Sequence, residues 1–165
     1  MEHWDAYDKD GHLLPGVTLV RGEPVPDGLF HLVCDVLVRH TDGSFLLMRR
    51  AKEKHFGGLW EATAGGSAIK GETAPDCAKR ELFEETGIRA DNLAEIGRVV
   101  HEGHRTYYVL FLCVTDCGKN SVVPQEGETD AYRWVSEEQL LTMTPHELCT
   151  TRMQQFYETW KIGGA

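Results

Sequence analysis

Glu81, Glu84 and Glu85 stand close together in the middle of the 165-residue chain. On an α-helix, which turns about 100° per residue, this spacing places all three carboxylates on one face. Like charges so spaced destabilise a helix by about 0.2–0.5 kcal/mol per pair unless a cation lies among them. A divalent ion that prefers oxygen ligands would relieve the repulsion and bind phosphate. The face therefore predicts metal-assisted chemistry on a phosphorylated substrate, with a solvated helix face as the alternative.

The residues around this helix follow a longer pattern. Gly66 is followed after five residues by Glu72, and after seven more by the run Arg80–Ile88, RELFEETGI. Together they resemble the Nudix hydrolase signature at every position from Gly66 to Ile88. The resemblance covers about residues 29–141. It implies an α/β fold, an α/β/α sandwich around a mixed β-sheet, and hydrolysis of a diphosphate linked to another group.

The resemblance also implies roles for individual residues. Glu84 and Glu85 correspond to metal-binding carboxylates, and Glu81 to a third metal ligand or the general base. The backbone carbonyl of Gly65 is a further expected ligand, because glycine lets the backbone approach an ion closely. Mg²⁺ is the expected cofactor and Mn²⁺ the alternative, since both accept oxygen ligands.

Arg80 and Glu72 complete the predicted catalytic set. Arg80 is expected to orient a neighbouring carboxylate, and the alternative is an ordinary ion pair with Glu84. Glu72 is expected to orient the site or to bind a second metal ion, and the alternative is a surface charge near the start of the helix. Glu126 and Glu128 lie where family members often place another ligand or base; which of the two serves, if either, stays open.

Residues expected to bind the substrate come from several parts of the chain. A basic cluster at residues 49–54 can attract phosphate, although it can also serve solubility at a strand end. An aromatic ring can stack on a base, and a glycine lets the backbone approach phosphate. The candidates are Arg49, Arg50, Trp60, Gly66, His104 and Arg105.

Composition limits the function further. The net charge of −9 opposes tight nonspecific binding to nucleic acid, which depends largely on Lys and Arg. The 41% apolar content without a long apolar run, and an amino terminus unlike a signal peptide, predict a cytoplasmic protein without a membrane anchor. Five cysteines without zinc-type spacing predict free thiols. The expected partner is a small diphosphate substrate, and the family resemblance adds a homodimer as a candidate assembly.

Strands must position the helix and its loop. Apolar, β-branched runs flank a turn at residues 41–43 and predict a hairpin. A short strand should lead into a turn at Gly65-Gly66, and a further antiparallel pair should follow the helix. The expected strands are 30–39, 44–50, 59–64, 95–100 and 106–115.

Helix ends are marked by capping residues. Thr73 can cap the glutamate-bearing helix, which should end near Thr86 before Gly87. Residues 136–139 and 144–147 each match the capping box of a helix start. Apolar residues at helical spacing then predict core contacts of a carboxy-terminal helix. These residues are Leu148, Met153, Phe156 and Trp160.

Residues 1–28 are turn-rich and predict a β appendage, which leaves residues 29–165 as the Nudix domain with its carboxy-terminal helix. The appendage resembles the isopentenyl-diphosphate isomerase branch of the superfamily. The catalytic Cys and His of that branch correspond here to Gly65 and Ser67, neither of which can protonate an alkene.

A Mg²⁺-dependent hydrolase is therefore expected, cleaving a diphosphate linkage in a small metabolite such as a nucleoside diphosphate derivative. The alternative from another class is a noncatalytic nucleotide-binding module, because a fold alone does not guarantee activity. The intact carboxylate set argues against that alternative.

Overall fold

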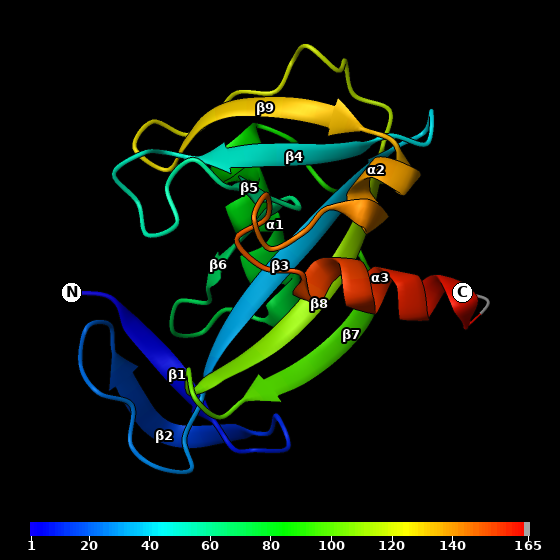
Figure 1. Cartoon of the computed structure of the whole chain (residues 1–165). Coiled ribbons are helices and arrows are strands. Elements are labelled where there is room, and N and C mark those ends of the chain that lie inside the picture. Colours follow the sequence, from blue (N-terminus) through cyan, green and yellow to red (C-terminus); the bar gives the residue numbers. More distant parts are fainter. Residues whose placement is uncertain (164–165) are drawn as a thin grey trace.

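The computed structural model describes residues 1–163. Within them, a seven-stranded mixed sheet and a two-stranded sheet combine with three helices (Figure 1). The strands are β1 (His3–Tyr7), β2 (Leu13–Val20), β3 (His31–His40), β4 (Phe45–Arg50), β5 (Trp60–Glu61), β6 (Ala64–Ser67), β7 (Ala94–His101), β8 (Thr106–Thr115) and β9 (Thr129–Val135). The helices are α1 (Ala74–Thr86), α2 (Glu137–Thr142) and α3 (Arg152–Ile162).

Strand β3 lies at the centre of the mixed sheet. It pairs in parallel with β8 along its whole length, and β7 pairs antiparallel with the far side of β8. Strand β4 pairs with β3 only at Arg39 and Phe45, beside the turn, and then diverges to pair with β5 and β9. Strand β6 instead lies beside β3 from Val33 to Val36. This divergence separates the β4–β5–β9 strands from β6.

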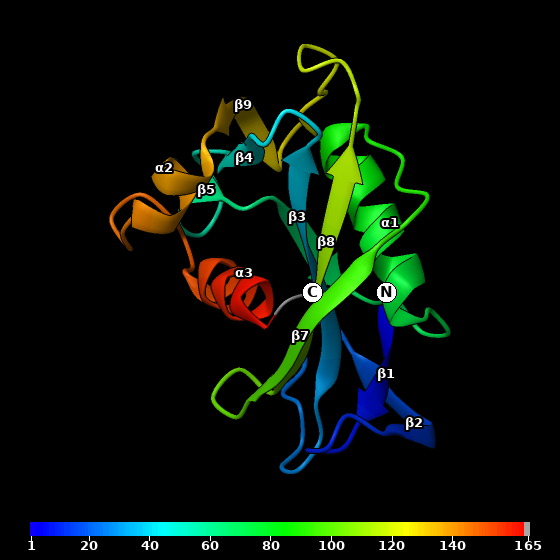
Figure 2. The ribbon, with the colours of Figure 1, turned by 90° about the vertical axis from the view of Figure 1, so that its right-hand side faces the viewer.

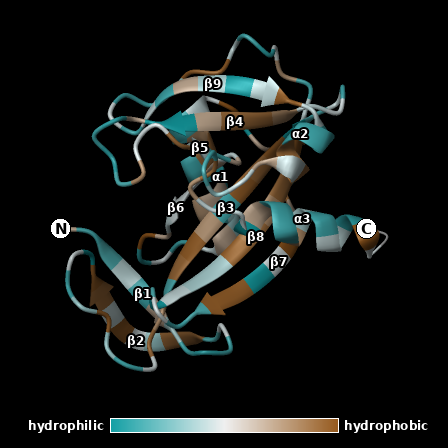
Figure 3. Ribbon diagram, in the orientation of Figure 1, coloured by the Kyte–Doolittle hydropathy of each residue, from teal (hydrophilic) through white to brown (hydrophobic). Residues whose placement is uncertain are grey.

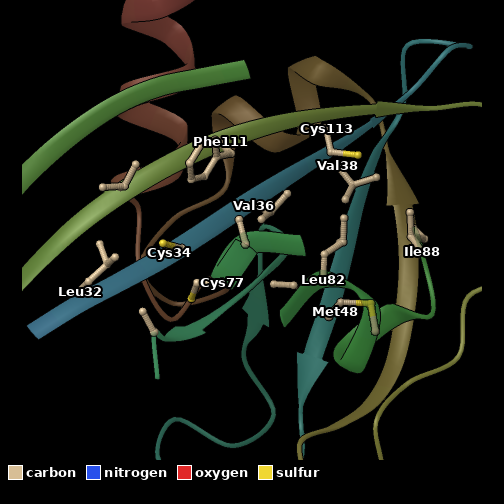
Figure 4. Packing of buried hydrophobic residues seen from close by; sticks show 14 of the residues in the cluster. Leu32, Cys34, Val36, Val38, Met48, Cys77, Leu82, Ile88, Phe111 and Cys113 are labelled. Atoms are coloured by element: carbon tan, nitrogen blue, oxygen red, sulfur yellow. The ribbon is translucent and has the colours of Figure 1, made fainter. Parts of the chain in front are cut away.

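Helices cover both faces of the sheet, with α1 on one side and α3 on the other (Figure 2). Alternate residues of β3 point to opposite faces, so its largely apolar sequence supplies both cores (Figure 3). Under α1, Cys77 and Leu82 pack with Cys34 and Val36 of β3 (Figure 4). Under α3, Met153 and Tyr157 belong to a second core with Leu37 and Leu110. The expected α/β/α sandwich is confirmed.

Helix α1 begins and ends where its capping residues predict. Thr73 Oγ1 accepts a hydrogen bond from the backbone N–H of Asp76 at 3.3 Å. Gly87 adopts φ 75°, and its N–H donates to the carbonyl of Phe83 at 2.8 Å. A left-handed residue at this position suits glycine because a side chain would be strained there. Local sequence therefore sets both ends of the glutamate-bearing helix.

The single strand expected at residues 59–64 is wrong. The chain there forms two short strands, because Glu61 pairs with Met48 of β4 whereas Ala64 pairs with Val36 of β3. Gly65 and Gly66 consequently lie within β6 and not in a turn. The segment crosses between two diverging strands, which periodicity over a few residues does not reveal.

The helix expected from residue 144 is also wrong. The capping contact forms, since Glu147 Oε2 accepts from the N–H of Thr144 at 3.0 Å. However, the next backbone groups bond to β5: Trp60 N–H donates to Glu147 O at 2.8 Å, and Cys149 N–H to Trp60 O at 3.0 Å. This segment is therefore a turn, and the carboxy-terminal helix starts at Arg152. The box at residues 136–139 does begin a helix, α2.

The two-stranded sheet is an antiparallel hairpin. We call residues 2–21, which include β1, β2 and the turn between them, the amino-terminal hairpin. Trp4, Ala6 and Leu19 form a small core within it. A domain boundary after residue 28 stays a prediction, and the last two residues of the predicted domain, 164 and 165, lie outside the described residues.

Close packing between β7 and α3 makes Gly97 sensitive to substitution. A Cβ at Gly97 would lie 1.9 Å from Phe156 Cδ1. We expect Gly97→Ala to destabilise the fold by about 1–3 kcal/mol, because an overpacked core must shift. Gly118→Ala is the matched control, since its added Cβ would lie 3.7 Å from its nearest neighbour, Ser121 Oγ. Thermal unfolding of the two variants measures the difference, and equal melting temperatures would contradict the packing argument.

Candidate active site

One cavity of about 400 Å³ lies against the glutamate-bearing face of α1. Its walls come from the diverging strands, from the segment before β9 and from the amino-terminal hairpin. We call it the carboxylate cavity. Its lining residues are Glu2, Arg21, Arg50, Lys54, Glu61, Gly65, Gly66, Ser67, Arg80, Glu81, Glu84, Glu85, Gln125, Glu128 and Thr129.

The charges of the carboxylate cavity do not balance. Six of its lining residues are glutamates and four are Arg or Lys. Arg50 forms an ion pair with Glu61, and Lys54 forms one with Glu128. The excess of carboxylates is concentrated at α1. The cavity can therefore accept additional positive charge while still offering cations to an anionic substrate.

Arg80 holds the loop before α1 against the helix. Its guanidinium donates to both carboxylate oxygens of Glu72, at 2.6 and 2.9 Å, and to Glu81 at 2.7 Å. It also donates to the carbonyl of Ser67 at 3.0 Å. Glu84, the alternative partner expected from helical spacing, is contacted at 3.3 Å. Arg80 thus bridges Glu72 and Glu81, and Glu72 lies behind the arginine rather than on the cavity wall.

Burial and neighbouring charges act on the carboxylates of α1. Glu85 is buried, and its pKa is raised well above the ordinary value by desolvation and by the charges of Glu61 and Glu81, while a backbone hydrogen bond with Gly65 opposes the shift. Burial likewise raises the pKa of Glu81, although Arg80 offsets part of that shift. Glu84 is exposed at the mouth. The ionised carboxylates are therefore costly without a cation.

Two glycines of β6 bring the backbone against this face. A Cβ at Gly66 would lie 2.4 Å from the carboxyl carbon of Glu81, and one at Gly65 would lie 2.1 Å from Asp35 Oδ1. Neither position has room for a side chain. The close approach leaves the backbone of Gly65, which is among the cavity-lining residues, beside the buried Glu85.

The donor set of the carboxylate cavity fits an oxygen-ligated divalent ion. Clustered carboxylates and nearby backbone suit Mg²⁺ or Mn²⁺, and no sulfur or imidazole is needed. Among residues 1–163, the group of three side chains whose potential ligand atoms all lie within 4.8 Å is elsewhere, at Asp8, Asp10 and His12. That group forms a turn, in which Asp8 accepts from the N–H groups of Asp10 and His12. Among the described residues, the glutamates of α1 are not gathered this closely.

Several residues expected to bind substrate lie elsewhere. Arg49 is paired with Asp130 at 2.6 Å, and neither lines the carboxylate cavity. Trp60 is also outside the cavity lining, with the guanidinium of Arg133 over its ring at 4.5 Å. Alternating side chains explain this, because Arg49 and Trp60 precede the cavity-lining Arg50 and Glu61.

The turn between β7 and β8 is not part of the cavity lining either. His104 stacks on His101 with ring centroids 3.9 Å apart, and Arg105 is paired with Asp27. Of the two acidic candidates before β9, Glu128 lines the cavity and Glu126 does not. The structure therefore brings together the carboxylates, Gly65, Gly66, Arg50 and Glu128.

Three charged lining residues were absent from the sequence expectations: Glu61, Glu2 and Arg21. Glu61 directly follows Trp60, and its register opposite Met48 turns it to the cavity side. Glu2 and Arg21 lie at the two ends of the amino-terminal hairpin and belong to no motif. Only Glu61 could have been found from the sequence. It directly follows Trp60 in a predicted strand, so the two side chains should point to opposite faces.

Comparison with known proteins places the chain in a family. The family model described as NUDIX domain matches residues 29–157. The chain is 33% identical over 144 residues to the uncharacterized Nudix hydrolase lmo0368 of Listeria monocytogenes, covering 85% of this chain and 83% of that protein. It is also 33% identical over 127 residues to the isopentenyl-diphosphate Delta-isomerase of Photobacterium profundum, covering 69% of each.

A solved structure agrees in fold. DR0079 from Deinococcus radiodurans superposes with a TM-score of 0.75 at 16% identity, covering 95% of this chain and 98% of that one. The family match agrees with the complete signature from Gly66 to Ile88, which runs from β6 through the capped helix α1. The chain belongs to the Nudix hydrolase family.

Proposed function

We propose that the protein is a Mg²⁺-dependent hydrolase that cleaves a diphosphate linkage in a small phosphorylated metabolite, with nucleoside diphosphate derivatives as the first candidates. The observation that carries this proposal is the carboxylate cavity, in which Glu81, Glu84 and Glu85 of α1 face cations from other elements. Its volume of about 400 Å³ falls within the usual range for small-ligand sites. Mn²⁺ is the alternative ion.

Each side chain has a role that follows from its place. Bound ions neutralise phosphate charge and make water more acidic, which is the chemistry that phosphoryl substitution needs. Glu84, Glu85 and the carbonyl of Gly65 would hold them, with Glu81 as a third ligand or the general base. Arg80 keeps Glu81 in position, because its guanidinium donates both to the carboxylate of Glu81 and to the carbonyl of Ser67.

Cations on the opposite wall would orient the substrate. Arg50 and Lys54 line the cavity, each paired with a glutamate, Glu61 and Glu128 respectively. Phosphate oxygens can take over hydrogen bonds from such carboxylates because both acceptors are anionic. These residues therefore place the diphosphate against the ion-binding face, and Gly66 lets the backbone approach it.

This chain lacks the acid that the isomerase reaction requires. Gly65 and Ser67 occupy the positions of the catalytic Cys and His, and Asp35 fills the space that a side chain at Gly65 would need. The isomerase relative therefore supports shared architecture rather than shared reaction.

A substrate panel tests the proposal. Phosphate and diphosphate release is measured with Mg²⁺, with Mn²⁺ and with a chelator, using nucleoside di- and triphosphates, nucleotide sugars, dinucleoside polyphosphates and isopentenyl diphosphate. We expect cleavage of at least one class, abolished by the chelator and restored by added Mg²⁺. Tight binding of one compound without turnover under any metal condition would instead identify a noncatalytic nucleotide-binding module.

Residues 1–163 contain no helix that is both long and apolar enough to cross a membrane. A cytoplasmic location and a homodimer stay predictions. Fractionation of cells and light scattering of the purified protein would test them.

A further inference from the structure

We propose that Arg21 of the amino-terminal hairpin is a substrate-binding residue that contacts a phosphate group in the carboxylate cavity, and that Glu2 holds its guanidinium until substrate replaces it. Both residues line the cavity, yet both lie before residue 29, where the match to the NUDIX domain begins. The inference rests on the proposed function for the identity of the ligand. The amino-terminal hairpin would then contribute a binding residue to the site.

The amino-terminal hairpin is docked on the loop that leads into α1. Lys70 N–H donates to the carbonyl of His3 at 2.8 Å, and Gly71 N–H donates to Asp5 Oδ2 at 2.7 Å. Lys70 Nζ also donates to Thr18 Oγ1 at 2.5 Å. Both strands of the hairpin are therefore tied to the segment immediately before Glu72. Figure 1 shows β1 and β2 below β6, beside the end of β3 at which that strand begins.

A second set of contacts fixes Glu2 itself. The ring of Trp4 stacks on His31, the first residue of β3, with centroids 4.2 Å apart and planes 13° apart. Trp4 is buried, and its indole N–H donates to Glu2 Oε1 at 2.7 Å. His31 Nδ1–H donates to the carbonyl of Arg105 at 3.0 Å. The carboxylate of Glu2 is thus connected to the central strand through one aromatic stack.

Arg21 is the least engaged of the four cavity cations. Its side chain is 65% exposed, and its guanidinium donates to Glu2 Oε2 at 3.2 Å. The side chains of Arg50, Lys54 and Arg80 are 22%, 30% and 26% exposed, and each has closer carboxylate contacts. An exposed ion pair of this kind contributes little to stability. Arg21 can therefore change partner at small cost.

Glu2 presents to Arg21 the same chemistry that a phosphate would. Carboxylate and phosphate oxygens both bind guanidinium, but phosphate offers more acceptors and more charge. A backbone bond, Arg21 N–H to Glu2 O at 3.0 Å, keeps the two residues adjacent whichever anion the guanidinium contacts. The preferred ligand class is hence a diphosphate compound, with one phosphate at the glutamates of α1 and the other in contact with Arg21.

Removing the charge of Arg21 tests the contact. For Arg21→Gln we expect KM for the best substrate of the panel to rise about 10-fold, with kcat within about 2-fold, because a hydrogen bond to a charged group is lost on binding. The dissociation constant of imidodiphosphate with Mg²⁺, measured by calorimetry, should rise similarly. Lys9→Gln is the matched control, since it removes an exposed cation of the same hairpin outside the cavity.

Glu2→Gln tests the exchange of partners. It should tighten imidodiphosphate binding about 3-fold, and this gain should vanish in the Arg21→Gln background. Glu23→Gln is its control, an exposed acidic residue outside the cavity lining. An equal gain in both backgrounds would show a general charge effect and would overturn the role given to Glu2.

The outcomes separate this inference from the proposed function. Turnover by the wild type with unchanged KM and unchanged imidodiphosphate binding in Arg21→Gln would overturn the inference alone. Absence of turnover across the whole panel would overturn the hydrolase, while weaker imidodiphosphate binding by Arg21→Gln would still establish the phosphate contact. Thermal unfolding of every variant verifies that the fold persists, as expected for side chains outside the core.

Discussion

Replacing Glu85 by glutamine is expected to lower metal-dependent turnover at least about 100-fold while the protein remains folded. Glu85 is buried at the back of the carboxylate cavity, where desolvation and the charges of Glu61 and Glu81 already raise its pKa. Glutamine keeps the shape and removes the charge. The ion would lose an anionic oxygen ligand, whereas the metal-free fold would lose a source of repulsion.

Two measurements separate these effects. Turnover with the best substrate, titrated with Mg²⁺, gives the loss of activity and any rise in the metal concentration required. Thermal unfolding in a chelator should give a melting temperature at or above that of the wild type. Glu138→Gln, on the exposed face of α2 outside the cavity, is the matched control and should leave both unchanged. Full activity in Glu85→Gln would remove this residue from the ion-binding set.

Replacing Arg80 by glutamine is expected to lower turnover about 10- to 100-fold and to destabilise the fold by about 2 kcal/mol. The side chains of Arg80, Glu72 and Glu81 are 26%, 15% and 13% exposed, so the ion pairs are partly shielded from water. Without the guanidinium, two carboxylates would be left close together, and Glu81 would lose the group that orients it. We expect a smaller loss of stability than for a fully buried ion pair, because solvent screens part of the interaction between these charges.

Arg80→Lys distinguishes orientation from charge. Lysine retains the positive charge but cannot reproduce the forked contact with both oxygens of Glu72. We expect it to restore part of the stability and little of the activity. Lys79→Gln, at the exposed neighbouring position of α1, controls for loss of a cation from the helix. If Arg80→Lys were as active as the wild type, charge alone would account for the role of Arg80.

The sequence alone determines helix α1 and the placement of its carboxylates. Thr73 and Gly87 cap its ends through contacts within a few residues, and Glu81, Glu84 and Glu85 share a face because of helical spacing. The long strands β3 and β8 are also set locally, since each is a largely apolar stretch of ten residues. Such features are readable because the interactions that produce them join neighbours in the chain.

Weaker local signals failed where distant partners decided the outcome. Trp60 and Ala64 belong to separate strands because β4 and β3 diverge, and the capping box at Thr144 is followed by pairing with β5 rather than by a helix. In both segments, backbone groups found partners far away in sequence. A pattern of a few residues cannot anticipate that choice.

Only the tertiary structure decided what surrounds the glutamates. Arg50 and Glu61 face the carboxylate cavity while their neighbours Arg49 and Trp60 do not, because a strand alternates its side chains and its register sets which ones point inward. Arg21, from the hairpin, reaches the same cavity only because that hairpin docks on the loop before α1. The local sequence thus determined the glutamate-bearing helix, whereas long-range packing determined which other charges line the carboxylate cavity with it.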